Sequence, residues 1–154
     1  MRLSTRSRYG TRLMLKLALN YNKGPIFLKD IAQDEEISEK YLSHLVIPLR
    51  ASGLIYSTRG PHGGYQLRKP PSKITIKDIV QSLEGNISPV ECVKNPSICS
   101  RADDCSVRDI WENLYEKIYE TLDSVSLEDL LGIDSRELKE ELERSEICEK
   151  QLLK

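Results

Sequence analysis

The sequence is poor in aromatic residues and histidine, and it contains no long hydrophobic run. Aromatic residues make up 6% of the 154 residues, with one tryptophan, one phenylalanine and two histidines. No apolar stretch approaches the roughly 18 residues that a helix needs to cross a bilayer. The basic segment at 1–12 is not followed by the apolar region of a secretory signal. We therefore expect a cytoplasmic protein with no membrane span.

Motifs for catalysis are also missing. There is no convincing nucleophile–base pair, no paired-carboxylate motif and no phosphate-binding loop for a cofactor. The glycine-rich segment RGPHGGY at 59–65 lacks the Lys-Ser/Thr of a nucleotide-binding loop and precedes a strand-like run rather than a helix. The sequence therefore predicts a binding protein and not an enzyme.

Charge is distributed unevenly between the two halves of the chain, although the net charge is only −1. Residues 1–70 contain 12 Lys/Arg against 5 Asp/Glu, whereas residues 71–154 contain 11 against 19. Lys and Arg displace condensed counterions from phosphates when a protein binds nucleic acid. A basic half is what a polyanion-binding protein needs, but an uneven surface without functional consequence is the alternative.

Residues 1–85 alternate helical and strand-like patterns. Apolar residues at helical spacing predict four helices, at 4–20, 28–33, 38–53 and 74–85. Pro48 inside the third helix is expected to kink or tighten its last turns. Two strand-like runs, 54–58 and 65–68, flank a Gly/Pro turn and predict a β-hairpin. This order of helices and hairpin is typical of a winged helix–turn–helix DNA-binding domain.

In a helix–turn–helix the second helix enters the major groove, and its early outward-facing residues meet base edges. Here those residues are Ser38, Glu39, Lys40, Ser43 and His44. Arg59 at the hairpin tip suits insertion into a minor groove, where the potential is most negative. Gly60 allows a tight turn and lets the backbone approach a phosphate. His62 is a phosphate contact, a ligand or an ordinary turn residue. Ordinary surface residues are the alternative for the whole set.

Three cysteines, Cys92, Cys99 and Cys105, lie in a loop-like segment with the spacing C-x6-C-x5-C. A reducing cytosol disfavours structural disulfides and favours metal or redox chemistry. Thiolates are the expected ligands of iron–sulfur clusters, whereas structural zinc sites usually contain a closer pair of cysteines. Zinc, a redox-switching disulfide and three unrelated cysteines are the alternatives. Cys148 lies far away in the charged tail and is expected to be solvated.

A long helix is predicted from about 104 to about 124, followed by a capped short helix at 126–131. The apolar positions of the long helix repeat in steps of three and four: Val107, Ile110, Trp111, Leu114, Ile118, Leu122 and Val125. Such a stripe can pair with a twin helix across a two-fold axis. The highly charged tail beyond it is expected to be a solvated or frayed helix.

The segments MRLSTRSRYGTRLMLKLA, LKDIAQ, ISEKYLSHLVIPLRASGLI and STRGPHGGYQL resemble the Rrf2 family of bacterial winged-helix regulators. The motif R-G-x-x-G-G-Y with a downstream three-cysteine loop is specific, and the likeness covers residues 1 to about 131. The resemblance implies a homodimer joined by the long helix and bound to double-stranded promoter DNA. It also implies that Cys92, Cys99 and Cys105 hold an iron–sulfur cluster, 2Fe–2S or 4Fe–4S, whose state controls DNA affinity.

The fourth cluster ligand departs from the family pattern. Where the IscR-like branch has a histidine three residues after the third cysteine, this chain has Arg108. Where other branches have a carboxylate or histidine near the start of the first helix, donated by the other subunit, this chain has Arg8 and Arg12. A guanidinium stays protonated and is normally no ligand, so these arginines are expected to stabilise an anionic cluster electrostatically. An iron open to an exogenous ligand is favoured; the alternative is closure by Asp103, Asp104, Glu91, Ser7 or Tyr9.

These observations predict a mainly α-helical protein with a small β-hairpin wing, divided into four parts. They are a winged helix–turn–helix domain (1–84), a cysteine cluster-binding loop (85–106), a dimerisation-helix region (107–131) and a charged tail (132–154). The expected function is transcriptional regulation, as a repressor or redox sensor, through the cluster. The alternative is a cluster-free DNA-binding regulator that answers a small molecule, a partner protein or thiol oxidation.

Overall fold

The computed structural model describes residues 3–132, so the predicted tail helix and Cys148 lie outside the described residues. The N-terminal part contains four helices and a hairpin: α1 (Thr5–Leu19), α2 (Leu28–Glu35), α3 (Glu39–Ala51), β1 (Ile55–Thr58), β2 (Gly64–Leu67) and α4 (Ile76–Glu84). A single 3-10 turn, η1 (Pro71–Lys73), leads from the hairpin into α4. The fold is therefore mainly α-helical with a two-stranded antiparallel wing, as predicted.

The helices begin at polar residues that accept hydrogen bonds from the first free backbone N–H groups. The side chain of Ser4 accepts one from Arg6, Ser38 accepts one from Tyr41, and Thr75 forms a reciprocal capping box with Asp78. Apolar residues at helical spacing then bury one face of each helix. The shared core consists mainly of Leu13, Met14, Leu17, Ile31, Leu42, Leu45, Leu49, Ile55, Ile74, Ile79 and Leu127, each at most 2% exposed.

The wing is anchored at its base and open at its tip. Its register pairs Ile55 with Leu67 and Thr58 with Gly64. A single-residue bridge attaches it to the α1–α2 connection, because Ile26 and Tyr65 exchange backbone hydrogen bonds of 3.1 and 2.8 Å. At Gly64 the backbone has φ = +139°, and a Cβ would collide with the carbonyl of Ile26. Glycine is therefore required where the wing crosses that connection.

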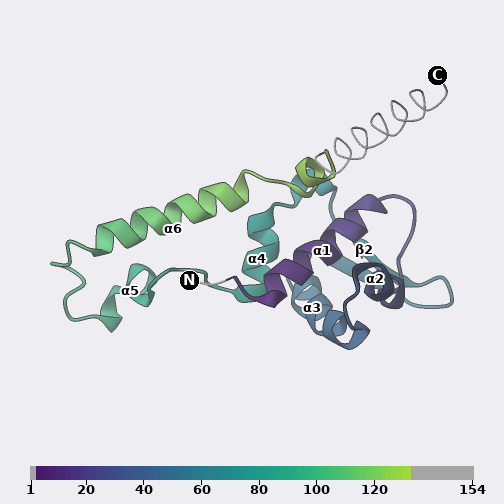
Figure 1. Ribbon diagram of the computed structural model, residues 1–154, viewed down its shortest axis with the longest axis horizontal. Helices are drawn as coiled ribbons and strands as arrows, with labels where there is room; N and C mark the ends of the chain where they lie inside the picture. The colour runs from purple at the N-terminus through teal and green to yellow at the C-terminus, as the bar shows by residue number, and fades with distance from the viewer. Residues whose placement is uncertain (1–2, 133–154) are drawn as a thin grey trace, which may run out of the picture.

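The second part of the chain extends away from this domain (Figure 1). Two short turns, α5 (Glu91–Lys94) and η2 (Pro96–Ile98), lead into the long helix α6 (Arg108–Asp123). The C-terminal end of α6 returns to α4: Lys77 pairs with Asp123 at 2.7 Å, and Leu127 N–H donates to Ile74 at 2.9 Å. The opposite end of α6, with the cysteine loop, lies at the far end of the molecule (Figure 1).

Several helix boundaries differ from the predictions by one to four residues, and those of α6 and α2 have a visible local cause. The long helix begins at Arg108 and not near Asp104, because the preceding residues form tight turns instead: Asp104 N–H donates to Arg101, and Arg108 N–H donates to Cys105. The second helix continues to Glu35, two residues further than predicted, and ends at Glu36 in the left-handed conformation. The short helix after α6 is present, and Ser126 caps it by hydrogen bonds with Asp129.

Candidate nucleic-acid interface and cysteine loop

The helix–turn–helix exposes most of the predicted base-reading residues. Ser38, Glu39, Lys40 and His44 are exposed at and after the N-terminus of α3, while Leu42 and Leu45 of the same helix are buried. Ser43 is only half-buried, and its hydroxyl donates to the carbonyl of Lys40 at 2.7 Å. The predicted set therefore forms one polar stripe along the outer face of α3.

A groove between α3 and the start of α1 adds residues that the sequence reasoning missed. It has a volume of about 700 Å³ and is lined by Ser4, Thr5, Arg6, Tyr41, His44, Leu45, Ile47 and Pro48. Thr5 and Tyr41 share a hydrogen bond of 3.1 Å between their hydroxyls, which fixes α1 against α3. Ile47 is 58% exposed, so α3 presents an apolar side chain beside its polar stripe. The run of basic residues near the N-terminus is the sequence feature that could have identified Arg6 as a groove residue.

The wing tip carries the other predicted contacts. Arg59, Gly60 and His62 are all exposed, and a turn closes between Gly60 and Gly63 with a hydrogen bond of 2.9 Å. Gly63 is buried inside this turn, where a Cβ would clash with the carbonyl of Thr58. The tip is therefore narrow, and the guanidinium of Arg59 is free to project from it.

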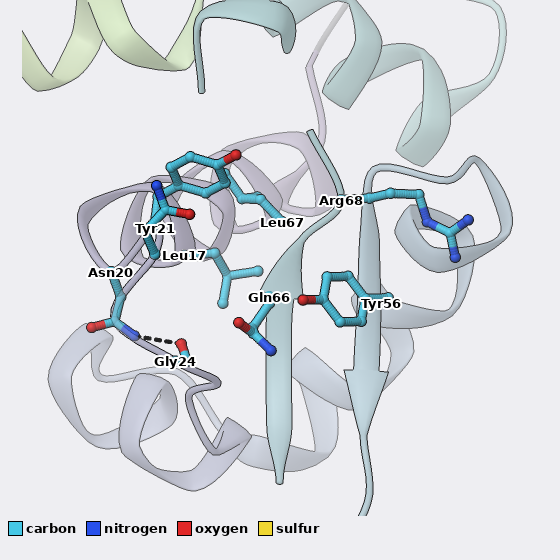
Figure 2. Close-up of a pocket in the computed structure, with 9 residues that line it drawn as sticks. Leu17, Asn20, Tyr21, Gly24, Tyr56, Gln66, Leu67 and Arg68 are labelled. Atoms are coloured by element: carbon cyan, nitrogen blue, oxygen red, sulfur yellow. Dashed lines mark hydrogen bonds between the residues drawn. The ribbon is translucent and has the colours of Figure 1, made fainter. Parts of the chain in front are cut away.

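A small pocket of about 190 Å³ lies between the strands of the wing and the end of α1. Figure 2 shows Leu17 of α1 and Tyr21 of the turn after it on one side, and Gln66 and Tyr56 from the strands on the other. The side-chain amide of Asn20 donates to the carbonyl of Gly24 at 2.8 Å and closes the loop above it. Its lining brings the end of α1 and the loop after it together with both strands of the wing.

The start of α1 is held by a carboxylate from α4. Glu84 Oε1 accepts hydrogen bonds from the backbone and hydroxyl of Ser4, and from the backbone (3.3 Å) and hydroxyl (2.7 Å) of Ser7. Burial acts to raise the pKa of Glu84, but these hydrogen bonds outweigh it and hold the pKa below its usual value. The residue that follows, Gly85, begins the connection to the cysteines. Glu84 therefore joins the groove-lining end of α1 to the base of the cysteine loop.

The three predicted ligands lie on one connection but on different turns of it. Cys92 lies in α5, Cys99 ends η2, and Cys105 precedes α6; all three are free and half-buried. Within residues 3–132, no group of three or more His, Cys, Asp or Glu side chains is close enough together to hold a metal ion. The donor set itself fits an iron–sulfur cluster, because thiolates are its ordinary ligands. The cluster site stays a prediction.

The three arginines that were expected to stabilise an anionic cluster, Arg8, Arg12 and Arg108, occupy different places in the fold. Arg12 pairs with Glu35 of α2 at 2.6 Å, and Arg8 lines an apolar pocket with Leu3 and Leu122. Arg108, the first residue of α6, reaches back to the cysteine loop: its Nη1 donates to the carbonyl of Ala102 at 3.4 Å. Its Nε is buried and has no hydrogen-bond partner in the described chain. A buried cationic donor without a partner is unfavourable, so this position suits an acceptor that the described chain does not supply.

One face of α6 is apolar and exposed. Val107, Ile110, Trp111 and Leu114 are 37–62% exposed, and no residue of α6 is fully buried. The other face is partly covered, because Lys94 of α5 lies over the ring of Tyr115. The predicted stripe is therefore unpartnered along the first half of the helix. In residues 3–132, no helix is long and apolar enough to cross a membrane.

The fold, the polar stripe on α3 and the narrow basic wing tip define a winged helix–turn–helix DNA-binding protein. The chain belongs to the Rrf2 family, described as iron-dependent transcriptional regulators, which its residues 3–132 match. It is thus a DNA-binding transcriptional regulator and not an enzyme.

Named relatives support this assignment. The chain is 44% identical to the protein rrf2 of Nitratidesulfovibrio vulgaris over 131 residues, which cover 85% of this chain and 87% of that protein. The structure of CymR (YrzC), the global cysteine regulator of B. subtilis, superimposes with a TM-score of 0.72 at 43% identity, covering 86% of this chain and 98% of that one. The structure of T. potens IscR gives a TM-score of 0.71 at 34% identity, covering 87% and 88%.

Proposed function

We propose that this regulator binds promoter DNA as a homodimer and that an iron–sulfur cluster held by Cys92, Cys99 and Cys105 controls its affinity. The observation that carries the proposal is the placement of three free, half-buried cysteines on a single connection. That connection joins the DNA-binding domain to a helix with an exposed apolar face. The family's description as iron-dependent and the likeness to IscR support the same reading.

The DNA contacts are divided between two elements. α3 offers Lys40 and His44 to base edges and phosphates in a major groove. Arg59 enters the adjacent minor groove from the wing tip, where a guanidinium meets the most negative potential. Phosphate contacts from the basic N-terminal half supply most of the affinity and make it salt-dependent.

The second half-site requires a second copy. The exposed face of Val107, Ile110, Trp111 and Leu114 is the surface that a twin α6 would cover. Such apolar steps of three and four suit an antiparallel or crossed helix pair about a two-fold axis. A dimer of this kind sets the separation of the two α3 helices, which must match half-sites about one helical turn apart.

The cysteine loop is placed to influence that separation. When bound, the cluster would supply an iron- and redox-dependent link among three thiolates of the loop. The loop in turn begins at Gly85, directly after the Glu84 carboxylate that holds Ser4 and Ser7 of α1. Because Thr5 of the same turn contacts Tyr41 of α3, a change in the loop reaches the recognition helix through two contacts.

The test is anaerobic reconstitution of the full chain with iron and sulfide, followed by native mass spectrometry. We expect a mass increment equal to a 2Fe–2S or 4Fe–4S cluster per subunit and visible absorption. The triple variant Cys92→Ala/Cys99→Ala/Cys105→Ala should lose both. Full retention of iron and sulfide by this variant would show that other residues are the ligands. The matched control is Cys148→Ala, which should retain the cluster.

A second candidate is a cluster-free regulator whose cysteines respond to oxidation, or which answers a small molecule or partner protein. The likeness to CymR favours it, because the Staphylococcus aureus CymR has been solved in an oxidized form. The two candidates predict different iron and sulfide contents for the protein purified without oxygen. A colourless protein lacking iron and sulfide, even after reconstitution, but with oxidant-sensitive DNA binding, would favour the second.

A further inference from the structure

The groove between α3 and the start of α1 lies beside the helix that is expected to enter the major groove of DNA. Its two walls come from these two helices and are lined by Ser4, Thr5, Arg6, Tyr41, His44, Leu45, Ile47 and Pro48. Of these residues, the proposed DNA contacts include only His44. Most of this surface therefore has no assigned role, although it adjoins the proposed interface.

Ile47 is an exposed aliphatic side chain on the outer face of α3. It is 58% exposed, whereas the preceding Val46 is 4% exposed and belongs to the core. Lys40, His44 and Ile47 follow one another at spacings of four and three residues, so they share one face of the helix. With a rise of about 1.5 Å per residue, this row is about 10 Å long and fits within a major groove about 12 Å wide. A helix inserted through Lys40 and His44 therefore brings Ile47 to the base edges as well.

An aliphatic side chain at that position favours one kind of base. The C5 methyl of thymine is apolar, whereas the other groups that base pairs present in the major groove are hydrogen-bond donors and acceptors. Isoleucine would desolvate the polar edge of guanine, adenine or cytosine without replacing the lost hydrogen bonds to water. Against a thymine methyl it instead removes apolar surface from water on both sides. Ile47 therefore suits a thymine.

The α1 wall of the groove is polar and cationic. Arg6 is exposed and forms no ion pair with another residue of the described chain. The hydroxyls of Thr5 and Tyr41 share a hydrogen bond of 3.1 Å that links the two walls. Among the described residues that line the groove there is no carboxylate. An apolar wall beside a cationic one matches a DNA strand, which presents base edges and phosphates side by side.

We propose that the groove holds one strand of the bound DNA, with Ile47 against the C5 methyl of a thymine and Arg6 against a phosphate of the same strand. Ile47 is then a specificity-determining residue, and Arg6 contributes affinity that does not depend on sequence. The inference rests on the DNA-binding part of the proposed function and does not require the cluster.

The experiment first selects a bound duplex from a random DNA pool with the full-length wild type. Each thymine of one half-site is then replaced by deoxyuridine, which lacks the C5 methyl, and affinities are measured by fluorescence anisotropy at fixed salt. We expect the wild type to lose about three- to fivefold in affinity at one thymine, as for a methyl group returned to water. Ile47→Ala should bind the thymine and deoxyuridine duplexes equally, and Ile47→Val should retain most of the discrimination. The control Ile98→Ala changes a comparably exposed isoleucine (57%) outside the groove and should discriminate as the wild type does.

Arg6 is tested by the salt dependence of the same binding. Arg6→Gln should reduce the slope of log affinity against log salt by about 1, because one phosphate contact is lost. It should leave the thymine discrimination unchanged, since a phosphate contact carries no sequence information. Arg101→Gln removes an exposed cation from the cysteine loop and should change neither the slope nor the discrimination.

Several results would overturn the inference while the proposed function stands. If no thymine gives a deoxyuridine penalty, or if Ile47→Ala keeps the wild-type penalty, Ile47 does not meet a thymine methyl. If Arg6→Gln keeps the wild-type slope, the strand does not lie along the α1 wall. If Ile47→Ala changes the oligomeric state of the DNA-free protein in sedimentation velocity, a second copy occupies the groove instead. Failure of the wild type to bind any duplex of the pool would overturn the proposed function itself, and the inference with it. Circular dichroism checks that each variant folds as the wild type does.

Discussion

The hydroxyl of Ser7 donates a 2.7 Å hydrogen bond to Glu84, across 77 residues of sequence. Ser7 is 2% exposed and is the one buried polar residue in the described chain. Glu84 closes α4 directly before the cysteine loop, while Ser7 lies in the first turns of α1, next to the residues that line the groove with α3. This contact joins the proposed sensing loop to the proposed DNA interface.

Replacement of Glu84 by Ala should destabilise the domain by about 1–3 kcal/mol, because it leaves the Ser7 hydroxyl buried without an acceptor. Urea unfolding followed by circular dichroism measures the change. Glu116→Ala, which removes an exposed carboxylate from the middle of α6, should shift stability by less than about 0.5 kcal/mol. Equal effects of the two substitutions would mean that the Glu84 contact contributes nothing specific.

The Glu84 contact should also give stability a pH dependence. Its pKa is lowered in the folded protein relative to the usual 4.5, since the hydrogen bonds from Ser4 and Ser7 outweigh burial. A lowered pKa contributes stability that is fully present above the unfolded value and is lost as the pH falls through the folded value. Below about pH 4.5, the wild type should therefore lose more stability than Glu84→Gln. Parallel pH profiles for the two proteins would contradict this.

Gly64→Ala should damage the wing. At φ = +139° a side chain is strained, and its Cβ would meet the Ile26 carbonyl that pairs with Tyr65. We expect a loss of about 1–3 kcal/mol in stability and weaker DNA binding. Gly132→Ala is the control, because a Cβ there meets nothing within 4 Å. A Gly64→Ala protein as stable as this control would show that the wing does not depend on the close approach.

Much of this fold is predictable from local patterns, and the boundaries that failed have local causes. Ser38 and Ser126 cap helices at the predicted positions because capping depends on adjacent residues. The turn of helix α5 was missed because four residues are too few to display a helical period. The beginning of α6 was placed early because turns and a first helical turn have similar composition.

The candidate site was predictable only where one segment supplies all of it. The exposed stripe on α3 follows from helical spacing alone, but Ile47 was missed because it lies between the buried Val46 and the core residue Leu49. The Glu84–Ser7 contact and the groove depend on how α1 packs against α3 and α4, which no local pattern encodes. Likewise, the pairing of Arg12 with Glu35 and of Arg108 with the Ala102 carbonyl depends on packing, and the expected role of these arginines at a cluster stays a prediction.

DNA binding should depend on the wing tip. Arg59→Ala should weaken binding by at least several-fold and reduce the slope of log affinity against log salt by about 1, since one phosphate-region contact is lost. Fluorescence anisotropy with a promoter fragment measures both. Lys117→Ala, an exposed cation on α6 already paired with Glu120, should leave the affinity and slope unchanged. Equal losses for both variants would indicate only a general effect of net charge.

The apolar face of α6 should hold two copies together. Ile110 is 62% exposed in the single chain, so Ile110→Lys would place a charge in the proposed interface. Sedimentation velocity should show a monomer for this variant and a dimer for the wild type. Glu112→Lys, two residues away on the other side of the helix, is the control and should remain dimeric. A dimer that survives Ile110→Lys would place the interface elsewhere.

The most direct test of the account is DNA affinity measured on the same protein with and without its cluster. One anaerobic preparation is divided into a reconstituted half and a half stripped of iron, and each is titrated with a promoter fragment at fixed salt. If the cluster controls DNA binding, the two affinities should differ by at least tenfold, and Cys92→Ala/Cys99→Ala/Cys105→Ala should have the stripped protein's affinity under both treatments. Identical affinities for the two halves, with the cluster verified by iron and sulfide content, would contradict the claim that the cluster controls DNA binding.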